Sequence, residues 1–61
     1  MKPETAVLIR KGDEYKRAAF SALGIMEWIP SDQEGKPLNP PAGSFLCHWY
    51  CKVPEGWEAV R

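Results

Sequence analysis

Both cysteines and the only histidine of the chain lie close together, at Cys47, His48 and Cys51, and they are the residues best suited to chemistry. Thiolate and imidazole groups are the usual ligands of zinc, and a pair of thiols can exchange with disulfides. On a helix, Cys47 and Cys51 would lie one turn apart and could share a metal ion. On an extended strand they would lie about 13 Å apart, because each residue advances the chain by about 3.3 Å. The chemistry of this segment therefore depends on its secondary structure.

The pattern of the surrounding residues favours a strand. In residues 44–53 one alternate set is wholly apolar, and the other set is mixed and wettable. The apolar set is Phe45, Cys47, Trp49, Cys51 and Val53, and the other is Ser44, Leu46, His48, Tyr50 and Lys52. Such alternation predicts a half-buried antiparallel strand. On it the cysteines are core residues, too far apart for one metal ion or one disulfide, and His48 faces the other way.

No other set of residues has a pattern that indicates catalysis. A catalytic histidine needs an oriented partner, and no serine is spaced to form a triad with His48. The carboxylates are scattered, and the glycines are too widely spaced for a phosphate-binding loop. We therefore expect no catalytic, cofactor-binding or metal-binding residues, and we expect the protein not to be an enzyme.

The segment after the cysteines predicts a hairpin. Residues 54–56, Pro-Glu-Gly, suit a tight turn, in which glycine takes the left-handed position. A three-residue loop places Val53 opposite Trp57, and Lys52 opposite Glu58 as a pair of opposite charges. The second strand of this hairpin is expected over 57–61.

The rest of the chain adds two more strands, one long loop and one ambiguous segment. Strands are expected over 5–11 and 25–29, the latter ending at Pro30. Residues 30–44 hold four prolines and two glycines, so we expect an irregular loop with a local turn at 34–36. Residues 13–23 fit a helix capped by Asp13, but they also alternate as a strand would after a tight turn at Gly12-Asp13.

These elements predict a small single domain over 1–61, of class α+β, in which a short helix near 13–23 packs on an antiparallel sheet. The alternative is an all-β, five-stranded SH3-like barrel in which 14–23 is also a strand. Residues 49–60, WYCKVPEGWEAV, resemble a hairpin of the plasmid-borne type II dihydrofolate reductases, which are SH3-like barrels. This resemblance covers about a fifth of the chain and implies the barrel, without that family's substrate-contacting motif. Both folds are expected to bury Val7, Ile9, Phe45, Cys47, Trp49, Cys51, Val53 and Trp57.

Charge and composition narrow the choice of partners. Eight basic and eight acidic residues give no net charge, which disfavours nucleic acid and anionic membranes as partners. No apolar run approaches the roughly 20 residues of a membrane span, and the N-terminal residues lack the apolar core of a signal peptide. Two cysteines allow at most one disulfide, so we expect free thiols and a cytoplasmic protein. A domain this small is marginally stable, which makes a homodimer one way to gain stability.

The sequence thus predicts a small protein-binding module, such as a phage- or plasmid-type regulator or inhibitor of a host protein. Its binding surface would be the outer face of the predicted hairpin together with part of the long loop. These residues are Leu46, His48, Tyr50, Lys52, Glu58, Leu38 and Asn39. One alternative is a nucleic-acid-binding module that uses a basic cluster, Arg10, Lys11, Lys16 and Arg17. A second alternative is a small metal or redox protein built on Cys47 and Cys51.

Overall fold

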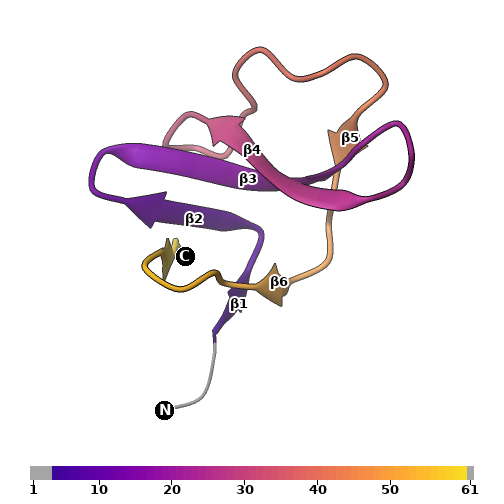
Figure 1. Cartoon of the computed structure of the whole chain (residues 1–61). Helices are drawn as coiled ribbons and strands as arrows, with labels where there is room; N and C mark the ends of the chain where they lie inside the picture. Colours follow the sequence, from indigo (N-terminus) through magenta and orange to yellow (C-terminus); the bar gives the residue numbers. More distant parts are fainter. Residues whose placement is uncertain (1–3, 61) are drawn as a thin grey trace.

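The computed structural model describes residues 4–60, and in these residues it contains strands and no helix (Figure 1). The strands are β1 (Thr5–Ala6), β2 (Leu8–Lys11), β3 (Glu14–Phe20), β4 (Met26–Ser31), β5 (Phe45–Leu46), β6 (Cys51–Lys52) and β7 (Glu58–Ala59). One antiparallel sheet has the order β4-β3-β2-β7, with β5 also paired to β3, and β1 and β6 form a second sheet. The predicted α+β class is therefore wrong. The all-β alternative fits, although the sheets do not close into a barrel.

The segment that was predicted as a helix, 13–23, is mostly β3. A tight turn at Gly12-Asp13 joins it to β2, with Gly12 at a φ of 62° and Lys11 opposite Glu14. Ala18 and Ala19 point to opposite faces of the sheet, and both are almost completely buried. Alanine is a strong helix former. In β3, however, both faces of the sheet are covered at this point, and the small alanine side chain fits the space on each face. Tertiary packing here outweighs local propensity.

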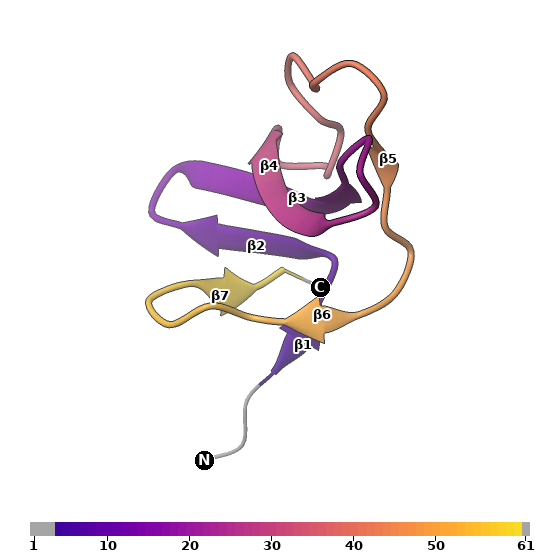
Figure 2. The same cartoon turned by 45° about the vertical axis from the view of Figure 1, so that its right-hand side comes forward.

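The strand predicted over 5–11 is present but divided at Val7. After β1 the chain bends, so that β1 and β2 belong to different sheets. At this bend β2 leaves the edge of β3, and β5 continues along it (Figure 2). Two backbone hydrogen bonds mark the exchange: Ala18 N donates to Val7 O at 2.9 Å, and Cys47 N donates to Ala18 O at 3.1 Å. The segment that enters the cysteine region is thereby fixed to the central strand.

The strand predicted over 25–29 is β4, which continues through Pro30 to Ser31. Pro30 is tolerated because β4 is an edge strand of its sheet. The carbonyl of Pro30 accepts a hydrogen bond from Leu38 N at 3.0 Å, on the side away from β3. Since the nitrogen and the carbonyl of one residue face the same side of a strand, proline removes no hydrogen bond between β3 and β4.

The long loop predicted over 30–44 begins after Ser31 with an ordered turn and is otherwise mostly irregular. The predicted turn at 34–36 lies slightly earlier, because Gly35 N donates to Asp32 O at 3.1 Å. The Asp32 carboxylate accepts hydrogen bonds from Glu34 N and Lys36 N, both at 2.9 Å. The Lys36 amide is the main reason that the pKa of Asp32 lies below its ordinary value.

The Asp32 turn predicts a loss of stability in acid. Because folding lowers this pKa, its contribution is present above the unfolded pKa, about 4, and is lost as pH falls through the lower folded value. We expect Asp32→Asn, which keeps an acceptor oxygen but cannot titrate, to flatten the decrease in stability below about pH 4. Urea unfolding of both proteins at several pH values measures this. Identical pH profiles would show that the turn does not favour the charged form.

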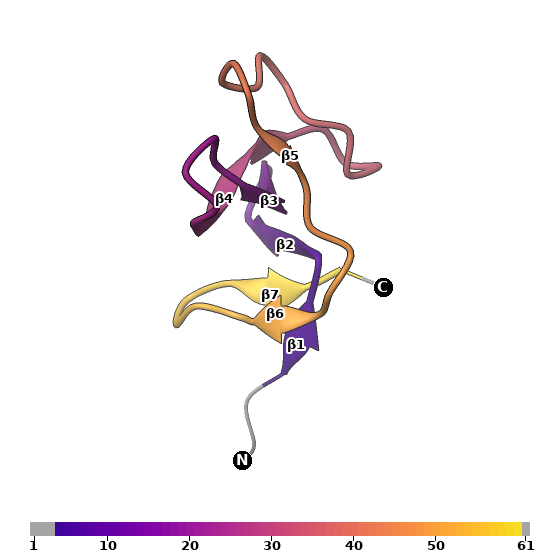
Figure 3. The ribbon, with the colours of Figure 1, turned by 90° about the vertical axis from the view of Figure 1, so that its right-hand side faces the viewer.

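The strand predicted over 44–53 is wrong. Only its ends are extended, and they lie in different sheets: β5 pairs with β3 and β6 pairs with β1. Between them residues 47–50 pass from one sheet to the other (Figure 3). The alternation therefore fails for the predicted core. Cys47 is fully buried, but Phe45 is 59% exposed and Trp49 is 69% exposed.

The remaining predicted core residues are buried to different degrees. Ile9 is fully buried, whereas Val7, Cys51, Val53 and Trp57 are only half-buried. The core consists mainly of small and aliphatic side chains. Its buried apolar members are Ala6, Leu8, Ile9, Ala18, Ala19, Ile29 and Cys47.

The hairpin predicted from 44–53 and 57–61 is also wrong in its pairing, although its turn at 54–56 is present. Trp57 N donates to Pro54 O at 3.2 Å, and Gly56 takes a φ of 91°. The two arms then diverge, because β6 pairs with β1 and β7 pairs with β2. Glu58 lies opposite Arg10, with a salt bridge of 3.1 Å, and not opposite Lys52. The last residue of the predicted strand, Arg61, lies outside the described residues.

Candidate protein-binding surface and cysteine pair

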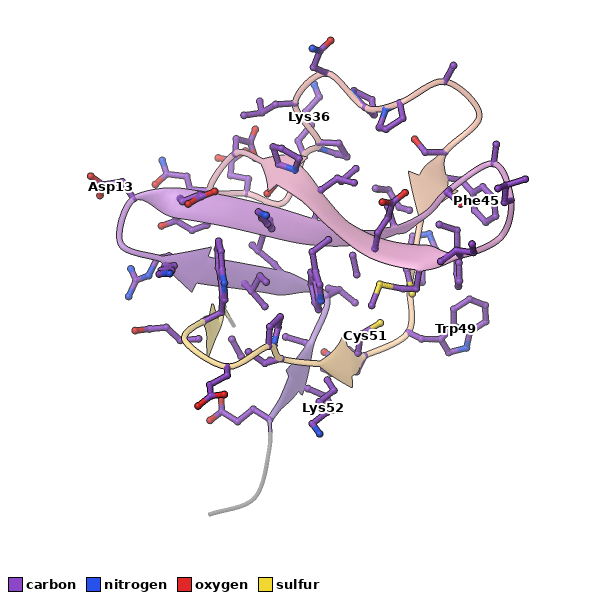
Figure 4. The ribbon with its side chains drawn as sticks, in the orientation of Figure 1. Asp13, Lys36, Phe45, Trp49, Cys51 and Lys52 are labelled. Atoms are coloured by element: carbon purple, nitrogen blue, oxygen red, sulfur yellow. The ribbon has the colours of Figure 1, made fainter. Side chains whose placement is uncertain are left out.

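Three aromatic rings from separate parts of the chain meet at one end of the main sheet. Phe20, the last residue of β3, is half-buried and lies opposite Phe45 of β5. The ring centroids of Phe20 and Phe45 are 5.5 Å apart, and those of Phe20 and Trp49 are 5.7 Å apart in an edge-to-face arrangement. Both separations are within the range of favourable aromatic pairs. Figure 4 shows Phe45 and Trp49 at the right-hand side of the molecule.

The loop that follows Phe20 adds two exposed aliphatic side chains, Leu23 and Ile25. Its shape is held by Ser21, whose hydroxyl accepts hydrogen bonds from Leu23 N at 3.2 Å and Ile25 N at 3.3 Å. We call Phe20, Leu23, Ile25, Phe45 and Trp49 the apolar end. It contains four of the six large hydrophobic side chains that are exposed among residues 4–60. Such a concentration of exposed apolar groups is typical of an interaction surface.

The two cysteines lie in contact, contrary to the separation expected for a strand. The Sγ atoms of Cys47 and Cys51 are 3.7 Å apart. Both thiols also point at one acceptor, the carbonyl oxygen of Trp49, at 3.5 Å from Cys47 and 3.4 Å from Cys51. Burial, with the adjacent Cys47, raises the pKa of the Cys51 thiol. The Cys51 thiol therefore favours its protonated form, and the pair is joined to the apolar end through Trp49.

Arg17 connects the cysteine region to the sheet. It lies on β3 opposite Leu8 and Ile29, and its Nη2 donates to the carbonyl oxygen of Cys47 at 3.1 Å. Its Nε is buried and has no hydrogen-bond partner among the described residues. No sequence pattern indicates this role, because the contact joins residues thirty positions apart. Arg17 is therefore a structural part of the cysteine region and not a free surface cation.

Replacement of Arg17 by methionine should loosen this connection. Arg17→Met keeps a long apolar stem but leaves the Cys47 carbonyl without its donor, at an expected cost of about 1 kcal/mol. We also expect Cys47 to be alkylated faster in the folded protein. The matched control is Arg10→Met, which removes an exposed ion pair and should leave both stability and thiol reactivity nearly unchanged. Equal thiol reactivity in the two variants would contradict the role of Arg17.

The predicted binding residues do not form one surface. Leu46 is half-buried in the main sheet opposite Ala19, whereas Lys52 is in the second sheet opposite Thr5. Glu58 is exposed and engaged by Arg10 on the main sheet. His48 and Tyr50 are exposed in the segment between the sheets, and Leu38 and Asn39 are exposed in the long loop. Their proposed role in binding stays a prediction.

Tyr50 also lies at a hollow in the surface of the described residues. It borders a pocket of about 190 Å³ at the junction of the two sheets. The other lining residues are Thr5, Ala6, Val7, Ala59 and Val60. Among residues 4–60, Tyr50 is the one titratable side chain that lines this pocket, so the described walls indicate packing and not chemistry.

The basic cluster is divided between the two faces of the main sheet. The register places Arg10 and Arg17 on one face and Lys11 and Lys16 on the other. Each lysine lies over the ring of Trp57, with Nζ at 5.9 Å for Lys11 and 5.4 Å for Lys16. The four cations therefore do not form a continuous basic patch.

Within residues 4–60 there is no group of three or more potential metal ligands. No helix in this part of the chain is long and apolar enough to cross a membrane. Comparisons with protein-family models, with curated proteins and with solved structures give no match.

Proposed function

We propose that the protein is a small protein-binding module, a regulator or inhibitor that binds its partner protein through the apolar end. The observation that carries this proposal is the exposure of Leu23, Ile25, Phe45 and Trp49 together at one end of a sheet. Exposed aromatic side chains are the usual anchors of protein interfaces. A cytoplasmic location is part of the proposal, because both cysteines are free thiols.

The apolar end is well suited to binding because its base is fixed. Phe20 belongs to the central strand and contacts both exposed rings, and the Ser21 hydroxyl holds the neighbouring loop. A preformed surface loses little conformational entropy on binding. Binding by the outer face of residues 44–53 has less support, since this segment is not one strand. Nucleic-acid binding also has less support, because Arg10 and Arg17 already have partners on the protein.

The test compares two aromatic residues of nearly equal exposure, Trp49 at 69% and Tyr50 at 71%. Partners are first captured from host extract with the wild-type protein, and the affinity for a purified partner is then measured. We expect Trp49→Ala and Phe45→Ala to weaken binding by about 30-fold or more, as loss of a central anchor does. Tyr50→Ala and His48→Ala should change it by less than about threefold.

The opposite result identifies the other surface. If Tyr50→Ala and His48→Ala abolish binding while Trp49→Ala does not, the partner is bound by the face that the sequence predicted. If the wild-type protein captures no other protein, sedimentation shows whether a second copy of the chain covers the apolar end. In that case Trp49→Ala should convert the dimer to a monomer. A wild-type protein that is itself a monomer, or a Trp49→Ala variant that stays dimeric, would overturn the proposal.

A further inference from the structure

The cysteine pair is a second site, independent of the proposed binding function. Cys47 and Cys51 have their Sγ atoms 3.7 Å apart, whereas a disulfide bond is about 2.05 Å long. Closing this gap requires a movement of less than about 2 Å. Cys51 lies in β6 and Cys47 N is bonded to β3, so the movement falls on the two side chains and on residues 48–50, which belong to no strand. We propose that Cys47 and Cys51 are a modification site for low-molecular-weight disulfides, at which the pair closes into a reversible intramolecular disulfide.

The two thiols differ in exposure, and this difference assigns their roles. Cys47 is fully buried, whereas Cys51 is half-buried at the start of β6. A disulfide from solution can therefore reach Cys51 but not Cys47. Cys51 is the entry thiol, and Cys47 is the resolving thiol that attacks from inside. Figure 4 shows Cys51 below the main sheet on the segment that also carries Trp49.

The reaction balances as two thiol–disulfide exchanges with a reagent RSSR. The Cys51 thiol first loses its proton to water, and its thiolate attacks one sulfur of RSSR. The S–S bond of the reagent breaks, a Cys51–SR mixed disulfide forms, and one thiolate RS⁻ leaves. The deprotonated Cys47 then attacks Sγ of Cys51, so that the Cys47–Cys51 bond forms and a second RS⁻ leaves. The protein loses two electrons and two protons, and RSSR is reduced to two RSH.

The surroundings of the pair control how fast this occurs. In the reduced protein both thiols point at the carbonyl oxygen of Trp49. Burial and the adjacent Cys47 favour the protonated form of the Cys51 thiol by raising its pKa. Arg17 holds the Cys47 carbonyl and so fixes the resolving thiol close to Cys51. Since the thiolate is the nucleophile, the exchange is slow at neutral pH and accelerates as the pH approaches that of thiol ionisation. A zinc site at the same place has less support, because residues 4–60 supply only the two sulfurs and no third ligand.

The experiment uses the full chain in buffers of graded ratio of oxidised to reduced glutathione, near pH 8.5, the ordinary pKa of a thiol. Samples are quenched in acid, alkylated and analysed by mass spectrometry. We expect the mass of the wild-type monomer to decrease by two hydrogen atoms, after a transient glutathione adduct on Cys51. Excess reduced glutathione should restore the original mass. Cys47→Ser should accumulate the adduct on Cys51. Cys51→Ser should remain mostly unmodified, at least about tenfold slower than Cys47→Ser, because Cys47 is buried.

Two results would overturn the proposal. In the first, the wild-type protein forms only stable glutathione adducts or disulfide-linked dimers, at ratios of oxidised to reduced glutathione that oxidise an ordinary dithiol. The other is equal modification of the two serine variants while both retain the wild-type circular dichroism spectrum. If either variant does not fold, peptide mapping of the wild-type intermediate decides the order, since an adduct first found on Cys47 contradicts the assigned roles. No partner protein is used, so failure here leaves the proposed binding function untouched.

Discussion

Ile9→Ala should largely unfold the protein at room temperature. Ile9 is one of the two largest side chains that are fully buried, and it lies at the centre of β2, between β3 and β7. Removing so much of a buried aliphatic side chain costs about 2–5 kcal/mol, through lost burial and the cavity that remains. A domain of this size rarely has more than about 3–5 kcal/mol of stability in total. One substitution therefore removes most or all of it.

The measurement is thermal unfolding followed by circular dichroism, with Ile25→Ala as the matched control. Ile25 is the same residue type, but it is 61% exposed in the loop after β3. We expect a change within about 0.5 kcal/mol for Ile25→Ala, as for most surface substitutions. For Ile9→Ala the midpoint should decrease by at least about 8 °C, because in a domain this small 1 kcal/mol corresponds to about 4–8 °C. If both variants unfold at the wild-type temperature, Ile9 is not in the core.

The parts of the fold that local signals specify were predictable from the sequence. The apolar run within 5–11 predicted a strand, the turn at Gly12-Asp13 was part of the all-β alternative, and Pro-Glu-Gly at 54–56 predicted the turn near the C-terminus. Glycine and proline act through their own backbone geometry, so their neighbours need not be known. These segments were identified for a sound physical reason.

The parts that depend on distant partners were not predictable. The alternation in residues 44–53 is real, but it does not say that β5 and β6 pair with strands of different sheets. The break between them brings Cys47 and Cys51 into contact and exposes Phe45 and Trp49. The same error therefore affected the cysteines and the aromatic residues. The cysteine pair and two members of the apolar end, Phe45 and Trp49, are residues that the pattern had assigned to the core.

The helix predicted near 13–23 failed for a different reason, and Ala19→Leu tests it. Leucine is almost as good a helix former as alanine, so helix propensity alone would make this change nearly neutral. In the structure Ala19 lies between Glu27 on one neighbouring strand and Leu46 on the other, and it is almost fully buried. We expect the larger side chain to cost about 1–3 kcal/mol or more, because there is no room for it.

The matched control is Glu27→Leu, on the strand directly opposite Ala19. Glu27 is exposed, so the same new side chain should be tolerated there with a change of less than about 0.5 kcal/mol. Urea unfolding of the two variants separates packing from propensity, because both introduce leucine at one cross-strand pair. If Ala19→Leu were as stable as Glu27→Leu, the Ala19 side chain would not be tightly packed in the sheet. The position of β5 on β3, which presents Phe45 beside Phe20, would then be wrong as well, and the apolar end would lose its structural basis.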